Sequence, residues 1–263
     1  MTTNGDASIV SAQSDFSAEQ VAKTAKIASR AFQALSLAQR NDALHLIHDD
    51  LQAAKADIIQ ANELDMQIAS KSSQYSAALV KRLDLRIPGK FEAMCQGVLD
   101  IAKLEDPLGR ITYAKKLDQG LNLYRMTCPI GCLLVIFEAR PEVVVNITAL
   151  ALKSGIHRHI QYLRAKLMTI LGNAAILKGG KESTNSFRKL AEIVTKALSQ
   201  SLVPSDAIQL VESREQISSL LAQHQYIDLC IPRGSNELVR SIQSNTKIPV
   251  SQMSIVAGAR LMG

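Results

Sequence analysis

Tryptophan is absent from this 263-residue sequence, and phenylalanine and tyrosine occur only five times each. The net charge of +6 is compatible with a nucleic-acid, membrane-surface or phosphate-bearing partner. Proteins that bind nucleic acid commonly combine basic side chains with aromatic rings that stack on bases, and the sequence has no such interleaving. We therefore expect no nucleic-acid partner. Part of the positive charge is also local, because residues 156–172 contain basic side chains and no acidic one.

Cysteine is scarce as well. The four cysteines are too few and too scattered for the disulfide framework of a secreted domain. Cys128 and Cys132 flank a short segment that resembles part of a strand, and no second cysteine pair accompanies them, so we expect no zinc site. His45 and His48 do not have the four-residue spacing of a helical zinc pair.

Long apolar runs are also missing. A membrane-spanning helix needs about 20 consecutive apolar residues, and no run approaches that length. The polar residues 1–20 lack the basic-then-apolar pattern of a secretory signal. We expect a cytoplasmic protein without a membrane partner, and the hydrophobic content of 47% is enough for a sizeable core.

The first part of the chain has the apolar periodicity of helices. From Ser17 to about Lys71, apolar residues recur every three or four positions, which is the spacing of one buried helix face. A further helix is expected from Ile87 or Pro88 to Ala102. The proline and glycine of "DPLGR" then interrupt the pattern. We expect residues 1–110 to form a helical layer.

Residues 111–250 have a different character. Two β-rich runs, "ITYAKKL" and "LNLYRMTC", come first, and then the strands "CLLVIF", "AAILKG", "IQLV" and "IDLCIP" alternate with helical stretches. Apolar strands that alternate with helices predict an α/β fold with a doubly wound parallel sheet. Ligands of such sheets bind beyond the carboxyl ends of the strands, on the turns into the helices. No internal repeat occurs.

One of these turns is "ILKGGKES". Its glycines would let the backbone approach a ligand, and its two lysines would suit a ribose or its 2′-phosphate. The alternative is a tight turn with solvated lysines. The candidate cofactor-binding residues here are Lys178, Gly179, Gly180, Lys181 and Ser183.

Two other turns carry candidates. In "IPRGSNELV", Gly234 and Ser235 could approach a pyrophosphate, and the alternative is an ordinary helix capped by Ser235. In "VIFEARPEVV", three charged residues follow an apolar run, where burial without partners would be costly. One interpretation is that all three contact substrate, and these candidates are Glu138, Arg140 and Glu142. The alternative is an internal pair between Glu138 and Arg140.

At "GCLLVIFEARPEVVVNITALALKSG", "NAAILKGGKES", "DPLGR" and "IPRGSNELV", the sequence resembles the γ-glutamyl phosphate reductase (glutamate-5-semialdehyde dehydrogenase) family of the aldehyde dehydrogenase superfamily. The resemblance covers residues 17–155 and 173–250. It implies reduction of L-glutamyl 5-phosphate to L-glutamate 5-semialdehyde by NADPH, with release of phosphate, in proline biosynthesis. The reaction would proceed through a cysteine thioester, because nucleophilic catalysis splits one hard step into two.

The resemblance also implies roles for individual residues. Lys178 matches the superfamily lysine that holds the adenosine ribose, and Gly234 and Ser235 match the turn beside the cofactor pyrophosphate. Glu138, Arg140 and Glu142 match the segment near the acyl group. Residues 111–250 would then be an NADP(H)-binding domain.

The sequence departs from the family in two places. Residues 156–172 are an insertion, and 251–263 replace the segment that carries the catalytic cysteine and the homo-oligomerisation region. No cysteine of this chain is at the catalytic position, so we expect no turnover. Splice-signal-like codons can encode both departures, which makes a mis-spliced product or a non-catalytic NADP(H)-binding fragment the alternative. The insertion also has the spacing of an amphipathic helix.

Overall fold

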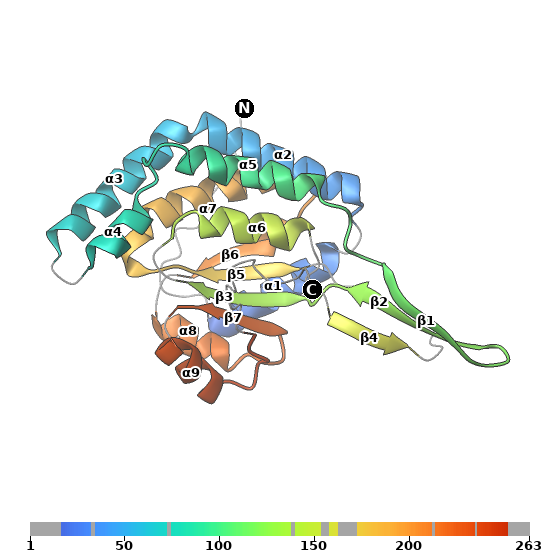
Figure 1. Cartoon of the computed structure of the whole chain (residues 1–263). Coiled ribbons are helices and arrows are strands. Elements are labelled where there is room, and N and C mark those ends of the chain that lie inside the picture. Colours follow the sequence, from blue (N-terminus) through green and yellow to red (C-terminus); the bar gives the residue numbers. More distant parts are fainter. Residues whose placement is uncertain are drawn as a thin grey trace, which may run out of the picture.

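A parallel four-stranded sheet forms the centre of the protein (Figure 1). The computed structural model describes residues 17–32, 35–72, 75–137, 140–153, 158–162, 173–211, 214–234 and 236–251. The sheet has the order β6-β5-β3-β7 and contains β3 (Cys132–Phe137), β5 (Ala174–Lys178), β6 (Ile208–Val211) and β7 (Leu229–Arg233). Helices cover both faces, which confirms the predicted α/β class.

One face of the sheet carries a double layer of helices (Figure 1). The inner helices are α6 (Val143–Lys153) and α7 (Thr184–Ser199). The outer ones are α2 (Leu37–Ala53), α3 (Lys55–Lys71) and α5 (Lys90–Lys103), with the short α4 (Ala77–Leu83) beside α3. The other face carries α1 (Ala18–Ala31), α8 (Arg214–Leu221) and α9 (Asn236–Ser244).

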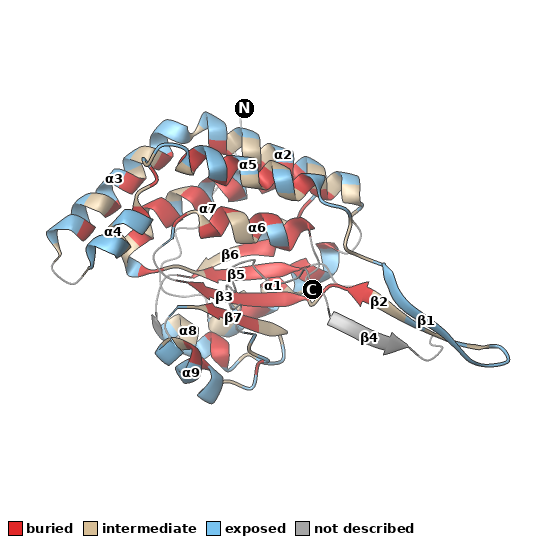
Figure 2. Ribbon diagram, viewed as in Figure 1, coloured by how far each residue is buried: buried red, intermediate tan, exposed pale blue. Residues whose placement is uncertain are grey.

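Alternation along β3 explains why the sheet is covered on both sides. Successive side chains of a strand point to opposite faces. Leu133, Val135 and Phe137 belong to the core under α2, α5, α6 and α7, whereas Cys132, Leu134 and Ile136 belong to the core under α1, α8 and α9. All six are apolar and buried, so the strand must be sandwiched (Figure 2).

The helical region agrees with the predicted type of structure but differs in its boundaries. The stretch from Ser17 to Lys71 is three helices, because Ser36 begins α2 with a reciprocal capping box to Gln39. The helix expected from Pro88 begins at Lys90, since Gly89 has a left-handed φ of 81°. The sequence pattern did not predict α4, which is only seven residues long.

A second, antiparallel sheet projects from the body (Figure 1). Its order is β1-β2-β4, with β1 (Ile111–Asp118), β2 (Leu121–Cys128) and β4 (Arg158–Tyr162). The helix suggested for the insertion is therefore wrong over 158–162. Backbone pairing with the edge of β2, from Cys128 opposite Arg158 to Tyr124 opposite Tyr162, overrides the helical spacing. Residues 156–157 and 163–172 lie outside the described residues.

None of the described helices combines the length and the apolar character that crossing a bilayer requires.

Candidate active site

The predicted turns meet at one edge of the sheet. In the strand register, Ile136 is opposite Lys178, Phe137 is opposite Arg233, and Lys178 is opposite Val211. The carboxyl ends of all four strands therefore lie in a row. The turn after β5, the turn after β7 and the turn after β3 all begin at this edge, which we call the carboxyl edge.

The turn after β5 is packed tightly against α7. The half-buried Lys178 ends the strand, and a 3₁₀ turn (Lys181–Ser183) leads directly into the helix. A Cβ atom added to Gly179 would lie 2.3 Å from the ring of Phe187, so only glycine fits there without a shift. Phe187 in turn packs on Phe137 of β3, with ring centroids 4.9 Å apart. The glycine thus brings the backbone against the helix.

A small hollow opens beside this turn. Its lining consists of Gly179, Gly180, Lys181, Thr184, Phe187, Leu210 and Val211. Its volume of about 20 Å³ is room for roughly one water molecule, so a nucleotide would lie across it rather than inside it. Lys181 is exposed and forms no ion pair with any residue that the structure describes. Ser183 is buried and makes contact with the Gly180 carbonyl group instead of facing the hollow.

The first turn of α7 is already occupied by a carboxylate from another helix. Asp65 of α3 is 2% exposed and accepts hydrogen bonds from the backbone N–H groups of Asn185 (3.0 Å) and Ser186 (2.7 Å). It also accepts from the Asn185 amide (2.8 Å) and the Ser186 hydroxyl (2.6 Å). The sequence-based idea that this helix N-terminus attracts a ligand anion is thus incomplete, because those N–H groups are used internally.

Asn62 supports the same junction from one turn earlier on α3. Its amide nitrogen donates to the Leu83 carbonyl (2.9 Å) and to the Ser186 hydroxyl (3.0 Å), and its amide oxygen accepts from the Leu85 N–H (2.9 Å). Sequence reasoning missed both residues. The signal was present, since Ile58, Asn62, Asp65 and Ala69 are the buried positions of α3 at helical spacing. Polar residues on an inward face require partners.

The turn after β3 carries the candidates for substrate contact. Glu142 is half-buried, and its Oε2 atom lies 3.7 Å from the Lys90 ammonium at the start of α5. Lys90 also donates to the Arg82 carbonyl group. Burial lowers the pKa of Lys90, the Glu142 carboxylate partly restores it, and the Arg140 cation lowers it further. Two cations and a carboxylate are thus close together, and Lys90 was not foreseen from sequence.

Two of the predicted residues cannot be placed. Glu138 and Ser235 lie outside the described residues, so the possible Glu138–Arg140 pair remains a prediction. Arg140 itself is exposed. Gly234 is also exposed, directly after Arg233 at the end of β7.

All four cysteines are free and buried, and their thiols are held in the protonated form. Burial raises the pKa of Cys95 to about 11 and the pKa values of Cys132 and Cys230 to about 12. Burial also raises the pKa of Cys128. A nucleophilic cysteine needs a depressed pKa and access to substrate. In their present positions these thiols behave as small apolar side chains.

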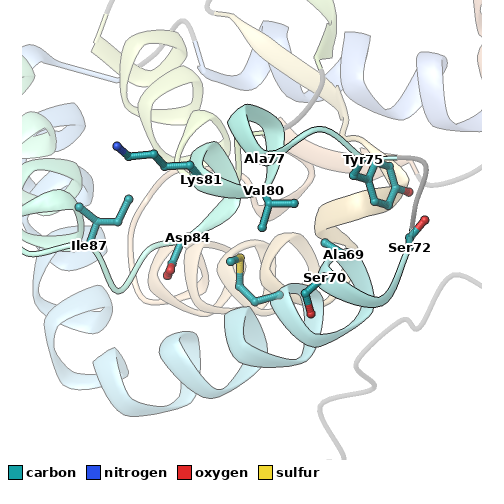
Figure 3. Close-up of a pocket in the computed structure, with 10 residues that line it drawn as sticks. Ala69, Ser70, Ser72, Tyr75, Ala77, Val80, Lys81, Asp84 and Ile87 are labelled. Carbon is teal, nitrogen blue, oxygen red and sulfur yellow. The ribbon is translucent and has the colours of Figure 1, made fainter.

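A larger hollow of about 540 Å³ lies between the end of α3, α4 and the segment that precedes α5 (Figure 3). Tyr75, Ser70 and Ser72 lie at one end of it, and Asp84 and Ile87 at the other (Figure 3). No sequence-predicted site residue lines it. Among the described residues, no cluster of three or more histidine, cysteine or acidic side chains could hold a metal ion.

Comparison with known proteins gives a consistent result. No protein-family model matches the chain. The probable γ-glutamyl phosphate reductase of Schizosaccharomyces pombe is 50% identical over 237 residues, which are 89% of this chain and 49% of that protein. The crystal structure of γ-glutamyl phosphate reductase from Saccharomyces cerevisiae aligns with a TM-score of 0.78 at 47% identity, over 89% of this chain and 55% of that one.

A probable aldehyde dehydrogenase from Listeria monocytogenes shares the fold at 14% identity, with a TM-score of 0.61 over 89% of this chain and 44% of that one. The chain spans about half the length of the curated relatives that it matches. Over that shared half, the chain is similar in sequence to the γ-glutamyl phosphate reductases and has the fold of the aldehyde dehydrogenases.

Proposed function

We propose that this chain is the NADP(H)-binding part of a γ-glutamyl phosphate reductase. The corresponding reaction reduces L-glutamyl 5-phosphate to L-glutamate 5-semialdehyde and releases phosphate, as a step of proline biosynthesis. The observation that carries the proposal is the 50% identity over 237 residues to a relative with that name. The row of turns along the carboxyl edge supports it, because nucleotides bind at this position in doubly wound sheets.

The residues present fit a dinucleotide with a 2′-phosphate. Lys178 and Lys181 would bring positive charge to the ribose, and Gly179 and Gly180 line the hollow without side chains of their own. Gly234 and Ser235 would lie beside the pyrophosphate. Bound NADPH would supply the hydride, while the chain's own contribution is to hold and orient the nucleotide along the edge.

The turn after β3 would face the acyl group of the substrate. Lys90 and Arg140 are two cations at this turn, with the carboxylates of Glu142 and Asp84 beside Lys90, and cationic side chains suit a substrate that carries phosphate and carboxylate groups. The Glu142 carboxylate holds Lys90 at the start of α5 and thereby connects that helix to the turn.

A second candidate function is binding without turnover. It is favoured by the state of the cysteines, because all four are buried and have raised pKa values. The thioester route needs an accessible thiolate, and none of these thiols provides one. We therefore expect the 263-residue chain, assayed by itself, to bind NADPH and to show no reductase activity.

Titration of the purified chain with NADPH tests the proposal. The fluorescence of the reduced nicotinamide reports binding, because it is excited at wavelengths that protein side chains do not absorb. Saturable binding that is tighter for NADPH than for NADH is expected. A chain that is folded by circular dichroism and binds neither nucleotide would contradict the proposal.

Activity is tested separately, by phosphate-dependent oxidation of glutamate semialdehyde, with the S. cerevisiae enzyme as positive control. Turnover near that of the control would show that one of the four cysteines becomes a nucleophile, and would refute the expectation of binding alone.

A further inference from the structure

We propose that Asp65 is a positioning residue for the NADP(H)-binding turn, a role that rests on the function proposed above. Asp65 belongs to α3 and is 120 residues away in sequence from the turn that it holds. It does not reach the hollow beside Lys181. Its contribution is to fix the first turn of α7, from which the residues of the binding turn extend.

The geometry makes Asp65 dependent on one short segment. All four of its hydrogen bonds come from Asn185 and Ser186, two from backbone N–H groups and two from side chains. It forms no ion pair within the described part of the chain. A buried carboxylate is tolerated only while such donors surround it. Any shift of residues 185–186 would therefore remove the stabilisation of this charge, so the segment is held in place.

The binding turn is attached directly to this fixed segment. Ser183 precedes the helix, its N–H donates to the Gly180 carbonyl (3.4 Å), and the Thr184 hydroxyl donates to the Lys181 carbonyl (2.9 Å). Local hydrogen bonds thus connect residues 180–184 to one another, and the next residue, Asn185, is held by Asp65. From the other side, Phe187 limits the position of Gly179. The backbone that presents Lys178 and Lys181 is consequently fixed at both ends.

Asp65 also determines which groups can meet a ligand phosphate. The N–H groups of the first turn of a helix would ordinarily attract an anion. Here a carboxylate occupies them and repels a second anion. The N–H groups of Asn185 and Ser186 are therefore closed to a ligand phosphate, and the lysine side chains of the turn are the charged groups that can discriminate a 2′-phosphate from a hydroxyl group.

The test compares two variants that lose the same kind of contact at opposite edges of the sheet. Asp65→Ala removes a buried acceptor for two backbone N–H groups at the carboxyl edge. Asn173→Ala is the matched control, because Asn173 is 0% exposed and accepts from the N–H groups of Ile130 (3.1 Å) and Gly131 (3.0 Å) where β3 and β5 begin. Ser186→Ala, which removes one donor to Asp65, is a milder second variant in case Asp65→Ala does not fold.

Two measurements are made on each variant. In NADPH titrations, Asp65→Ala is expected to raise the Kd about tenfold or more and Ser186→Ala about threefold, whereas Asn173→Ala changes it less than about twofold. In amide hydrogen exchange without nucleotide, both carboxyl-edge variants should speed exchange of residues 179–186 beyond any change in the control.

Equal effects of Asp65→Ala and Asn173→Ala on the Kd would overturn the inference. Unchanged exchange at residues 179–186 in a folded carboxyl-edge variant would do the same. The exchange measurement needs no nucleotide. It therefore still tests Asp65 if the unmodified chain does not bind NADPH, a result that would contradict the proposed function alone.

Discussion

The substitution Gly179→Ala should destabilise the protein although it adds a single methyl group. The new Cβ would lie 2.3 Å from Cε2 of Phe187 and 2.6 Å from two more ring atoms. Ordinary van der Waals contact begins near 3.4 Å, so the overlap is about 1 Å. Phe187 cannot turn away freely, since it is 3% exposed and packs on Phe137, which is 2% exposed.

Relief therefore requires movement of two buried rings or of the end of β5. Overpacking of this kind costs about 1–3 kcal/mol. For a chain of this size, such a loss lowers the Tm by roughly 2–12 °C. Urea unfolding followed by far-UV circular dichroism measures the loss, and tyrosine fluorescence can serve as a second probe.

Gly97→Ala is the matched control. Gly97 lies inside α5, and its added Cβ would meet only Asn146 Oδ1 at 3.6 Å, an ordinary contact. Alanine in a helix interior is favoured over glycine by about 0.5–1 kcal/mol, so this variant should gain stability. The double variant Gly179→Ala/Phe187→Leu should lose at least about 0.5 kcal/mol less unfolding free energy than the sum of the losses of the two single variants. If Gly179→Ala is as stable as the unchanged protein, the close packing of the turn on α7 is refuted.

Four further outcomes are expected. The native thiols should not react with Ellman's reagent at pH 8, whereas all four should react in urea; one fast native thiol would contradict their burial. Burial raises the folded-state pKa of Cys95 from 9.0 to about 11 and those of Cys132 and Cys230 to about 12. The unfolded chain therefore loses these thiol protons first, and stability should fall from about pH 9 upward, as urea midpoints across pH would show. Asp106→Asn should cost about 2 kcal/mol in urea unfolding, because Asp106 pairs with the 3% exposed Arg40, whereas Glu105→Gln in the exposed pair with Arg110 should cost less than about 1 kcal/mol. Lys181→Gln should weaken NADPH binding about tenfold and leave NADH binding within about twofold, and equal effects on both nucleotides would exclude a 2′-phosphate contact.

The parallel sheet could be predicted because its strands are short, apolar runs between helical stretches, and burial on both faces leaves no other arrangement for β3. The turns that follow β3, β5 and β7 could be assigned to one edge for the same reason. The strand β4 could not be predicted, because residues 158–162 have the apolar spacing of a helix. They form a strand because they pair with the open edge of β2.

The contacts around the site were harder to predict. Asp65 acts through Asn185, which lies 120 residues away in sequence, and Lys90 acts through Glu142, which lies 52 residues away. A single sequence shows which residues share a helix face, but it does not show which distant segment that face will meet. The roles of Asp65 and Lys90 depend on tertiary packing, which puts α3 against α7 and the start of α5 against the turn after β3.

The position of α1 has a consequence for the order of folding. This helix lies under the sheet, where it packs against β3, β5 and α8, and Lys26 pairs with Asp228, 202 residues later. During synthesis, α1 therefore has no docking surface until nearly the whole sheet has been made. Helices α2 and α5 can assemble earlier, since they pack on each other. Docking of α1 should be a late, non-local step, and its apolar face must remain unaggregated until then.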